Sequence, residues 1–583
     1  MKGKILMKNI RTKCIVAALI LSMSFSAGLP AFAAEVPVQT ASQTEQTVQT
    51  VSVKELAKEY FAEYPSDKHV VSAQVFLSRV DSDEALCVID LRSAEDYAAG
   101  HIKGAVNVPY GVAVAEALEQ IPTDVPVLVY CYSGQTASQT IALLRLAGKD
   151  AYNVSGGFTG ISKQEQAKAL TVKTAQQLEE GEYPVDQQLK TAIREYYELA
   201  EKSGKFNMSA EKVKEALSND EIYLVDIRSE NDYLKSRISG AKRNIPFGKG
   251  MQNELVKLPK DKKIVFQCYS GQTASQTVAI ARMLGLDAYN LSGGMGARGG
   301  SGWLGAGYGV VKFSTQQFLN AKADRYFASL PKNKNQVSAA AFLEAVKAEE
   351  PAVILDIRSV EDYEKGHVKG AVNVPYGVEV AKALGTIPTD KTVYVYCYSG
   401  QTASQTVFLL HLAGVQAINV SGGFDKGISK AEGAQELMTT EAAELPAEEY
   451  AVDADIKEAV TAYYKAVAKE ETYGKNNISP AALKELMDKG SDEICVVDLR
   501  SAEDYAAGHI KGAISLPYGR GMQESFDILP EDKTLILQCY SGQTASQTVA
   551  ALRIKGYTAY NLSGGMGAEG GSGWLGAGYE LVK

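Results

Sequence analysis

The ten-residue sequence Cys-Tyr-Ser-Gly-Gln-Thr-Ala-Ser-Gln-Thr occurs four times in this chain of 583 residues, beginning at Cys131, Cys268, Cys397 and Cys539. Each occurrence lies 41 or 42 residues after an Asp-x-Arg and 22 residues before an Asn that opens Asn-[Val/Leu]-Ser-Gly-Gly. Fixed spacing between three separate motifs indicates four copies of one domain. A chain of this length holds roughly three to six domains of ordinary size, so four copies account for most of it.

The copies are of two alternating types. After Ser-Gly-Gly, copies two and four continue into a glycine-rich segment, Gly293 to Tyr308 and Gly564 to Tyr579, whereas copies one and three continue into Phe158 and Phe424 and then a polar linker. This order predicts two tandem A–B pairs, as the duplication of a two-domain ancestor would produce. The predicted domains are 52–164 and 314–429 (type A) and 183–312 and 451–583 (type B), with linkers near 165–182 and 430–450.

Each copy has the pattern of a βαβ unit. The run Val127 to Tyr130 before the cysteine is apolar without alternation, which is typical of a central strand in a parallel sheet covered on both faces. A helical pattern from Thr140 to Ala147 ends at Gly148, and Ala151 to Val154 form a further strand. The fold class is therefore predicted to be α/β, with four small domains, each a parallel sheet with helices on both faces.

The cysteine lies where a central strand ends and a helix begins, the usual ligand-binding edge of an open α/β sheet. Gly134 permits a tight backbone turn, and loop N–H groups and the positive end of the helix dipole can converge on the sulfur. Such surroundings stabilise a thiolate and hold an anionic adduct. The sequence therefore predicts that Cys131, Cys268, Cys397 and Cys539 are catalytic nucleophiles.

The residues that follow each cysteine are predicted to form the substrate-binding loop. They are Tyr132, Ser133, Gly134, Gln135 and Thr136; Tyr269, Ser270, Gly271, Gln272 and Thr273; Tyr398, Ser399, Gly400, Gln401 and Thr402; and Tyr540, Ser541, Gly542, Gln543 and Thr544.

Three motifs recur together: the Asp-x-Arg, the sequence Asp-Tyr-x-x-Gly-His-Ile-x-Gly-Ala-x-Asn-Val-Pro from Asp96 to Pro109, and the strand that ends in Cys-Tyr-Ser-Gly-Gln-Thr. Together they resemble the rhodanese homology domain of sulfurtransferases. The resemblance implies that the cysteine takes sulfane sulfur from a small donor such as thiosulfate, becomes a persulfide, and passes the sulfur to a thiophilic acceptor such as cyanide or a thiol. It also implies that a six-residue loop holds the persulfide with its N–H groups.

Two departures from the family pattern narrow the chemistry. Related phosphatases need Cys-x5-Arg, because the arginine clamps phosphate, but here the sixth residue is Ala137, Ala274, Ala403 or Ala545, so phosphatase and arsenate-reductase chemistry by that route are not expected. Thiosulfate-preferring relatives carry cationic residues in the loop, whereas this loop is uncharged. A persulfide or polysulfide donor is therefore favoured over thiosulfate.

Other polar residues are interpreted as structural. The Asp-x-Arg pairs are expected to be ion pairs at strand ends: Asp90 and Arg92, Asp226 and Arg228, Asp356 and Arg358, Asp498 and Arg500. His101, His367 and His509 are expected to fix a turn, and copy two has Arg237 at that position. Cys87 and Cys495 lie in apolar runs and are expected to be buried packing residues, as are Trp303 and Trp574. The cysteines and five histidines have no metal-ligand spacing, so neither a metal nor a cofactor is expected.

The first 33 residues have the layout of a secretory signal: five cationic residues, an apolar run from Ile15 to Leu29, and Ala31-Phe32-Ala33. Cleavage near Ala33 predicts an extracytoplasmic protein with a flexible tail, 34–51, and no membrane span after cleavage. A net charge of −9, despite this cationic start, argues against nucleic-acid binding. The expected partners are the small sulfur donor and the thiophilic acceptor, and the sequence identifies no protein partner. The alternative is a non-catalytic redox-sensing or partner-binding array.

Overall fold

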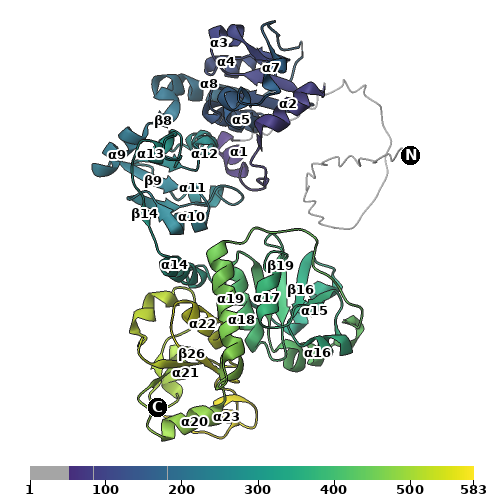
Figure 1. The fold of residues 1–583 in the computed structure, drawn as a ribbon, viewed down its shortest axis with the longest axis vertical. Helices are drawn as coiled ribbons and strands as arrows, with labels where there is room; N and C mark the ends of the chain where they lie inside the picture. The colour runs from purple at the N-terminus through teal and green to yellow at the C-terminus, as the bar shows by residue number, and fades with distance from the viewer. Residues whose placement is uncertain (1–51, 83, 180) are drawn as a thin grey trace, which may run out of the picture. The chain divides into compact units, whose positions relative to one another are not determined.

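The computed structural model describes residues 52–82, 84–179 and 181–583, in which each copy forms one five-stranded parallel sheet (Figure 1). The strand before the cysteine is the middle strand of every sheet. The predicted α/β fold class is therefore confirmed, while the arrangement in two A–B pairs stays a prediction. The predicted signal peptide and tail, 1–33 and 34–51, lie outside the described residues.

The five strands of each sheet follow the same order from edge to edge in all four copies. Copy one has β1 (Val70–Val71), β6 (Ala151–Val154), β5 (Val127–Tyr130), β2 (Cys87–Asp90) and β4 (Ala105–Asn107). Copy two has β8 (Asn207–Met208), β13 (Ala288–Leu291), β12 (Lys263–Gln267), β9 (Ile222–Asp226) and β11 (Ala241–Asn244). Copy three has β15 (Gln336–Val337), β20 (Gln416–Val420), β19 (Thr392–Tyr396), β16 (Ala352–Asp356) and β18 (Ala371–Asn373). Copy four has β22 (Asn477–Ile478), β26 (Ala559–Leu562), β25 (Thr534–Gln538), β23 (Ile494–Asp498) and β24 (Ile514–Ser515).

The helices recur in corresponding places. Those that follow the cysteine are α5 (Gln135–Leu146), α12 (Gln272–Met283), α18 (Gln401–Leu412) and α22 (Gln543–Ile554). Those that precede the first strand of each sheet are α1 (Val53–Glu59), α8 (Gln187–Lys202), α14 (Thr315–Ala328) and α19 (Ala454–Lys469). Those after the first strand are α2 (Ala73–Asp81), α9 (Ala210–Ser218), α15 (Ala339–Lys347) and α20 (Pro480–Asp488). Shorter helices include α3 (Ala94–Ala99), α10 (Glu230–Lys235), α16 (Val360–Lys365), α21 (Ala502–Ala507), α4 (Val112–Ala117), α11 (Gln252–Leu255) and α17 (Val378–Ala383).

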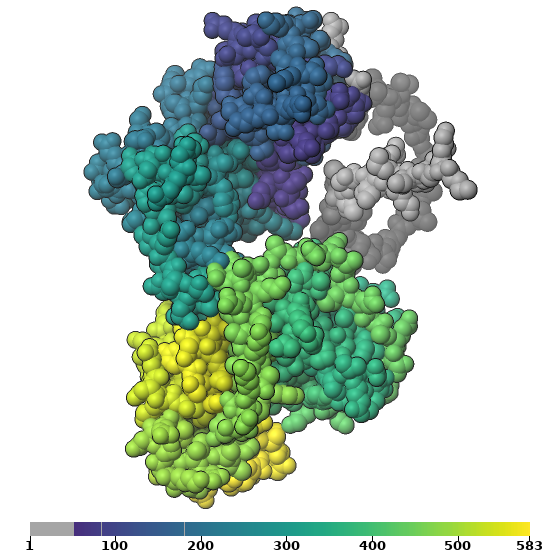
Figure 2. All heavy atoms as spheres, in the orientation of Figure 1, coloured from purple at the N-terminus to yellow at the C-terminus, as the bar shows by residue number. Residues whose placement is uncertain are grey.

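The middle strand has a separate apolar cluster on each face. In copy one, Leu128 and Tyr130 pack with Phe76 of α2, whereas Val129 and Cys131 pack with Ile141 of α5. The cluster on the cysteine face also contains residues of copy two, and α5 packs directly against α12. Figure 2 shows the outer surface of the chain in the same orientation. None of the helices formed by the described residues combines the length and the hydropathy needed to cross a bilayer.

The sequence placed the strands before and after the cysteine correctly, because β5 and β6 have the predicted bounds. The helix between them begins earlier than predicted, at Gln135 rather than Thr140. More than half of the repeated sequence is therefore helical. The polar residues Ser138, Gln139 and Thr140 are fully buried in this helix, so an apolar period could not reveal its start.

A buried ion pair closes the end of β2 beside the cysteine-bearing strand. Arg92 Nη2 donates to Asp90 Oδ2 at 2.6 Å and to the carbonyl oxygen of Gly100 at 2.8 Å. The side chains of Arg92 and Asp90 are 4% and 0% exposed. The same pairing occurs in Asp226–Arg228, Asp356–Arg358 and Asp498–Arg500. Each pair ties the end of a strand to the loop after the next helix, which is the geometry of a structural ion pair.

Replacing Arg358 by Met is expected to destabilise copy three by about 3–5 kcal/mol, because it leaves the buried carboxylate of Asp356 unpaired. Amide hydrogen exchange should accelerate in β16 and β19 while β2 and β5 of copy one, in the same molecule, serve as the reference. Lys382→Met, which removes an exposed ion pair with Glu379, is the matched control and should cost at most about 1 kcal/mol. Unchanged exchange in copy three of Arg358→Met would contradict a structural role for the pair.

Candidate active site

The sulfur of each repeated cysteine accepts two backbone N–H groups. In copy one, Cys131 Sγ accepts from Gly134 N at 3.1 Å and from Ala137 N at 3.4 Å. The other three copies have the same two contacts at the same two distances. A sulfur that accepts two N–H groups at a helix N-terminus lies where negative charge is stabilised.

The loop that makes these contacts is short. Gly134 has a left-handed backbone, with φ of 85°, and it caps α5, so Ala137 donates to the sulfur from the first helical turn. Gly271, Gly400 and Gly542 have the same conformation. Instead of a six-residue loop, each site has four residues of loop followed by the start of a helix, which aims the helix dipole at the sulfur.

The Ser-Gly-Gly turn lies directly against the loop. Phe158 N, just after the turn, donates to the carbonyl oxygen of Cys131 at 2.7 Å, and Thr159 N donates to that of Tyr132 at 3.0 Å. A Cβ atom on Gly157 would lie 2.4 Å from the Cys131 oxygen and 2.7 Å from Gly134 N. Gly294, Gly423 and Gly565 have equally close contacts. Sequence reasoning did not assign these glycines to the site, although their fixed distance from the cysteine was the signal.

A tyrosine and an aspartate form the rim of each loop. The hydroxyl of Tyr132 donates to Asp96 Oδ2, and this bond, with one from Ser93, lowers the pKa of the Asp96 carboxyl. In copy three, bonds from Tyr398 and Lys365 lower the pKa of Asp362 to about 2. Tyr269 and Tyr540 donate to Asp232 and Asp504 in the same way. These bonds keep a carboxylate ionised beside the loop.

The remaining predicted loop residues have distinct surroundings. Ser133 Oγ accepts from Gln135 Nε2 at 3.3 Å, within the same loop. The side-chain oxygen of Gln135, in contrast, accepts from Asn290 of copy two. The cation closest in sequence to the rim, Arg92, is committed to Asp90 and lies 3.6 Å from the ring centroid of Phe158. A cation of the neighbouring copy comes near one rim, because Lys475 Nζ of copy four lies 6.0 Å from the ring centroid of Tyr398 in copy three.

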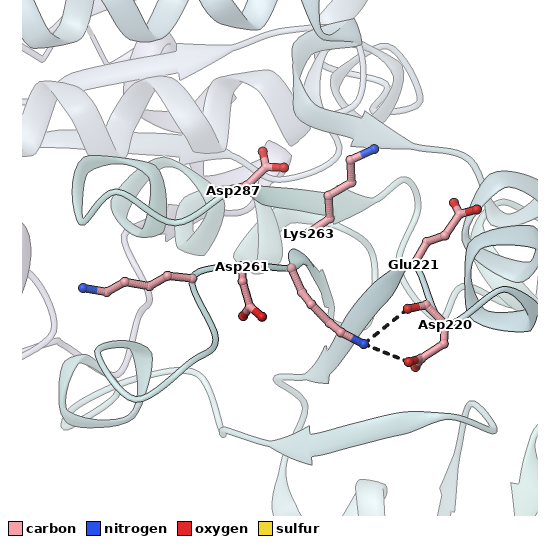
Figure 3. Close-up of a pocket in the computed structure, with 7 residues that line it drawn as sticks. Asp220, Glu221, Asp261, Lys263 and Asp287 are labelled. Atoms are coloured by element: carbon pink, nitrogen blue, oxygen red, sulfur yellow. Dashed lines mark hydrogen bonds and ion pairs between the residues drawn. The ribbon is translucent and has the colours of Figure 1, made fainter.

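A charged hollow on copy two lies away from the cysteine. It is lined by residues that include Asp220, Glu221, Lys263 and Asp287, and Lys262 donates to Asp220 in it (Figure 3). Glu221, Lys263 and Asp287 stand at the amino-terminal ends of β9, β12 and β13. Because Cys268 follows the carboxyl end of β12, the hollow is at the opposite edge of the sheet.

The histidine, the tryptophan and the remaining cysteines lie in different surroundings. Both ring nitrogens of His101 lie against backbone carbonyls, of Tyr97 at 2.9 Å and of Thr174 at 3.1 Å. Trp303 is buried, and its Nε1 donates to the carbonyl of Gly309. Cys87 and Cys495 are half-buried rather than fully buried, and burial raises the pKa of the Cys87 thiol to about 12. A thiol with so high a pKa is a poor nucleophile at neutral pH.

Gly157→Ala is expected to lower the reactivity of Cys131 towards iodoacetamide by about tenfold or more, because the new methyl group displaces the loop that holds the sulfur. The three other cysteines provide reference rates after peptide mapping. Gly148→Ala is the matched control, since Gly148 is also left-handed, with φ of 79°, but has open space at the Cβ position. Equal effects of the two substitutions on Cys131 would show that backbone strain, and not the contact with the loop, is responsible.

Comparisons with known proteins identify one domain family in this chain. The family model for the rhodanese-like domain matches residues 72–164, 209–297, 338–430 and 479–568. A stretch of 98 residues, 17% of the chain, is 33% identical to the putative sulfur carrier protein YrkF of Bacillus subtilis and covers 52% of it. The chain thus spans about half the length of that relative. A stretch of 77 residues, 13% of the chain, is 38% identical to the thiosulfate sulfurtransferase GlpE of Pseudomonas fluorescens and covers 70% of it.

Among solved structures, a thiosulfate sulfurtransferase from Pseudomonas aeruginosa is 19% identical, with 88% of this chain and 90% of that chain covered and a TM-score of 0.17. A TM-score this low does not show a shared overall arrangement. Two of these relatives are named as sulfurtransferases, GlpE and the probable adenylyltransferase/sulfurtransferase MoeZ of Mycobacterium tuberculosis, which is 32% identical over 89 residues. The four family matches together cover more than half of the sequence, and the chain belongs to the rhodanese-like domain family.

Proposed function

We propose that this protein is a sulfurtransferase that carries sulfane sulfur as a persulfide on Cys131, Cys268, Cys397 and Cys539. The proposal rests on one observation: two backbone N–H groups at the start of a helix donate to each cysteine sulfur. Backbone N–H groups at a helix start also favour the terminal sulfur of a persulfide, which is anionic after deprotonation, and this supports the proposal.

The reaction divides into two balanced displacements. In the first, the cysteine thiolate attacks the terminal sulfur of a persulfide donor, a new S–S bond forms, and the donor leaves as a thiolate with the electron pair of the broken S–S bond. In the second, a nucleophile such as cyanide or a thiolate attacks the terminal sulfur of the enzyme persulfide, and the cysteine thiolate returns. The cysteine thiolate is the nucleophile of the first step and the leaving group of the second, so stabilising that form of the cysteine is the principal task of the loop.

We propose a persulfide or polysulfide, rather than thiosulfate, as the better donor. Thiosulfate is a dianion, and the loop residues from Tyr132 to Thr136 carry no positive charge. The nearby Asp96 carboxylate, whose pKa is lowered, adds negative charge at the rim. Backbone dipoles would therefore have to bind thiosulfate against a repulsive carboxylate, whereas a singly charged or neutral donor experiences less repulsion.

We also propose that the protein is exported, on the basis of the cationic start, the apolar run and the small residues before Ala34. Amino-terminal sequencing of the protein from its native cells should find a chain that begins at Ala34, and a chain that still contains residues 1–33 would contradict export by this signal.

Replacing all four loop cysteines by Ser is expected to reduce sulfur transfer by at least about a hundredfold, because Ser cannot form the persulfide. Intact mass of the parent protein after polysulfide treatment should rise by the mass of one sulfur atom per loop cysteine and fall again with cyanide. Cys87→Ser with Cys495→Ser is the control that should keep both behaviours. No mass gain with either thiosulfate or polysulfide, on protein with free thiols, would favour a binding or redox-sensing array instead.

Replacing Asp96, Asp232 and Asp504 together by Asn is expected to raise kcat/KM for thiosulfate by about twofold to fivefold, the size of one Coulomb interaction through water. Asp362 is left unchanged, because it also forms an ion pair with Lys365. Asn still accepts the tyrosine hydrogen bond, so the rim geometry is kept. The increase should shrink at high ionic strength and be smaller for a neutral donor. An equal change for the two donors would contradict an electrostatic role for the rim.

A further inference from the structure

The first glutamine of each repeated sequence extends out of its own copy. Gln272 Oε1, from copy two, accepts from Asn153 Nδ2 at 2.8 Å and from Gly156 N at 3.4 Å, both in copy one. The exchange is reciprocal: Gln135 Oε1 accepts from Asn290 Nδ2 at 2.9 Å and from Gly293 N at 3.1 Å. Each glutamine thus bonds the Asn-x-Ser-Gly-Gly segment of the neighbouring copy.

Copies three and four repeat this exchange. Gln543 Oε1 accepts from Asn419 Nδ2 at 2.8 Å and from Gly422 N at 3.3 Å, and Gln401 Oε1 accepts from Asn561 Nδ2 at 2.7 Å and from Gly564 N at 3.4 Å. Four glutamines in four separate loops therefore have one shared role in the structure, which a single chance contact could not produce.

The segment that receives the glutamine is the one that supports the cysteine loop. Gly156 precedes Gly157, which lies against the Cys131 carbonyl, and Phe158 N donates to that carbonyl at 2.7 Å. Gln272 also lies close to the loop itself, because a Cβ atom on Gly134 would be 2.6 Å from Gln272 Oε1. Gln272 therefore lies beside Gly134, the residue whose N–H donates to the Cys131 sulfur.

Helix packing between copies one and two keeps their cysteine loops close enough for this exchange. The helices α5 and α12 pack against each other, and each leading helix packs on the other copy: α1 contacts α12, and α8 contacts α4. The second glutamine of the repeat contributes as well. Gln139 Nε2 donates to the carbonyl of Lys205 at 2.9 Å, and its Oε1 accepts from the hydroxyl of Tyr196 at 2.8 Å.

The two types of copy depend to different extents on the glutamine of the neighbouring copy. Asn290 Nδ2 has a second acceptor within its own copy, Asn207 Oδ1 at 2.7 Å, and Asn561 has Asn477 Oδ1 at 2.7 Å. All four asparagines are fully buried, but the acceptor of Asn153 and Asn419, in type A copies, is the glutamine of the neighbour. Losing the glutamine should therefore disturb a type A site more than a type B site.

We infer that the loop glutamine of each copy is a positioning residue for the cysteine of the neighbouring copy, so that a pair of copies, rather than a single domain, is the functional unit. The inference rests on the proposed function for its meaning in sulfur transfer. Its physical content, the placement of one thiolate by the loop of another copy, concerns thiol reactivity and is measurable without any sulfur donor.

The test is the pH profile of iodoacetamide alkylation at each loop cysteine in the full chain with Gln272→Met, resolved by peptide mapping. The four tryptic peptides differ outside the repeat, so every site is read separately. We expect the alkylation rate at Cys131 to change by about 2- to 30-fold and its pH midpoint to shift, with Cys397 and Cys539 as unchanged internal references. Gln135→Met should affect Cys268 in the same sense but by less.

A change confined to Cys268, the cysteine in the same loop as Gln272, would overturn the inference, as would an unchanged profile at Cys131. If Gln272→Met does not fold, Gln272→Glu replaces it, since a carboxylate accepts the same two bonds. Its charge against the Cys131 loop should move the Cys131 midpoint to higher pH, and an upward shift at Cys268 alone would again contradict the inference. If the substitution alters the alkylation profile at Cys131 but polysulfide forms no persulfide on the parent protein, the proposed function fails and this inference stands.

Discussion

The hydrogen bond between the residue after Ser-Gly-Gly and the carbonyl oxygen of the cysteine is the constraint on which each site depends. It joins the ends of two adjacent parallel strands, β5 and β6 in copy one. The approach is so close that the second glycine of the turn cannot carry a Cβ atom without striking the loop. Because this hydrogen bond fixes the backbone at the cysteine, the N–H groups at the helix start remain directed at the sulfur. No charged side chain is needed to hold the sulfur there.

This constraint explains what the sequence could predict. A strand, a helix and a strand of fixed length separate the cysteine from the turn, so the constant spacing of 22 residues between the two motifs follows from their meeting in space. The strand bounds were predictable because β5 is apolar throughout. The start of α5 was not, because Ser138, Gln139 and Thr140 are polar and are buried partly by residues of the neighbouring copy, as the bond from Gln139 to Lys205 shows.

The two types of copy support the same loop by different packing. In type A copies an aromatic ring after the turn, Phe158 or Phe424, lies over the arginine of the buried ion pair. In type B copies a methionine occupies that position, and the glycine-rich segment brings Trp303 or Trp574 against the turn, with Trp303 N bonded to the Gly294 carbonyl at 3.0 Å. The sequence predicted that the two types of copy alternate. Only the structure shows that both kinds of packing support the same cysteine loop.

The loop glutamine couples the two loops of neighbouring copies. Gln272 donates to Ser270 in its own loop while it accepts from Asn153 and Gly156 in the other copy, so one side chain serves two sites. A substitution there disturbs both loops at once, and a compensating change in one loop does not repair the other. Keeping the glutamine in both loops keeps the reciprocal exchange, whereas the residues that follow the turn differ between the two types of copy.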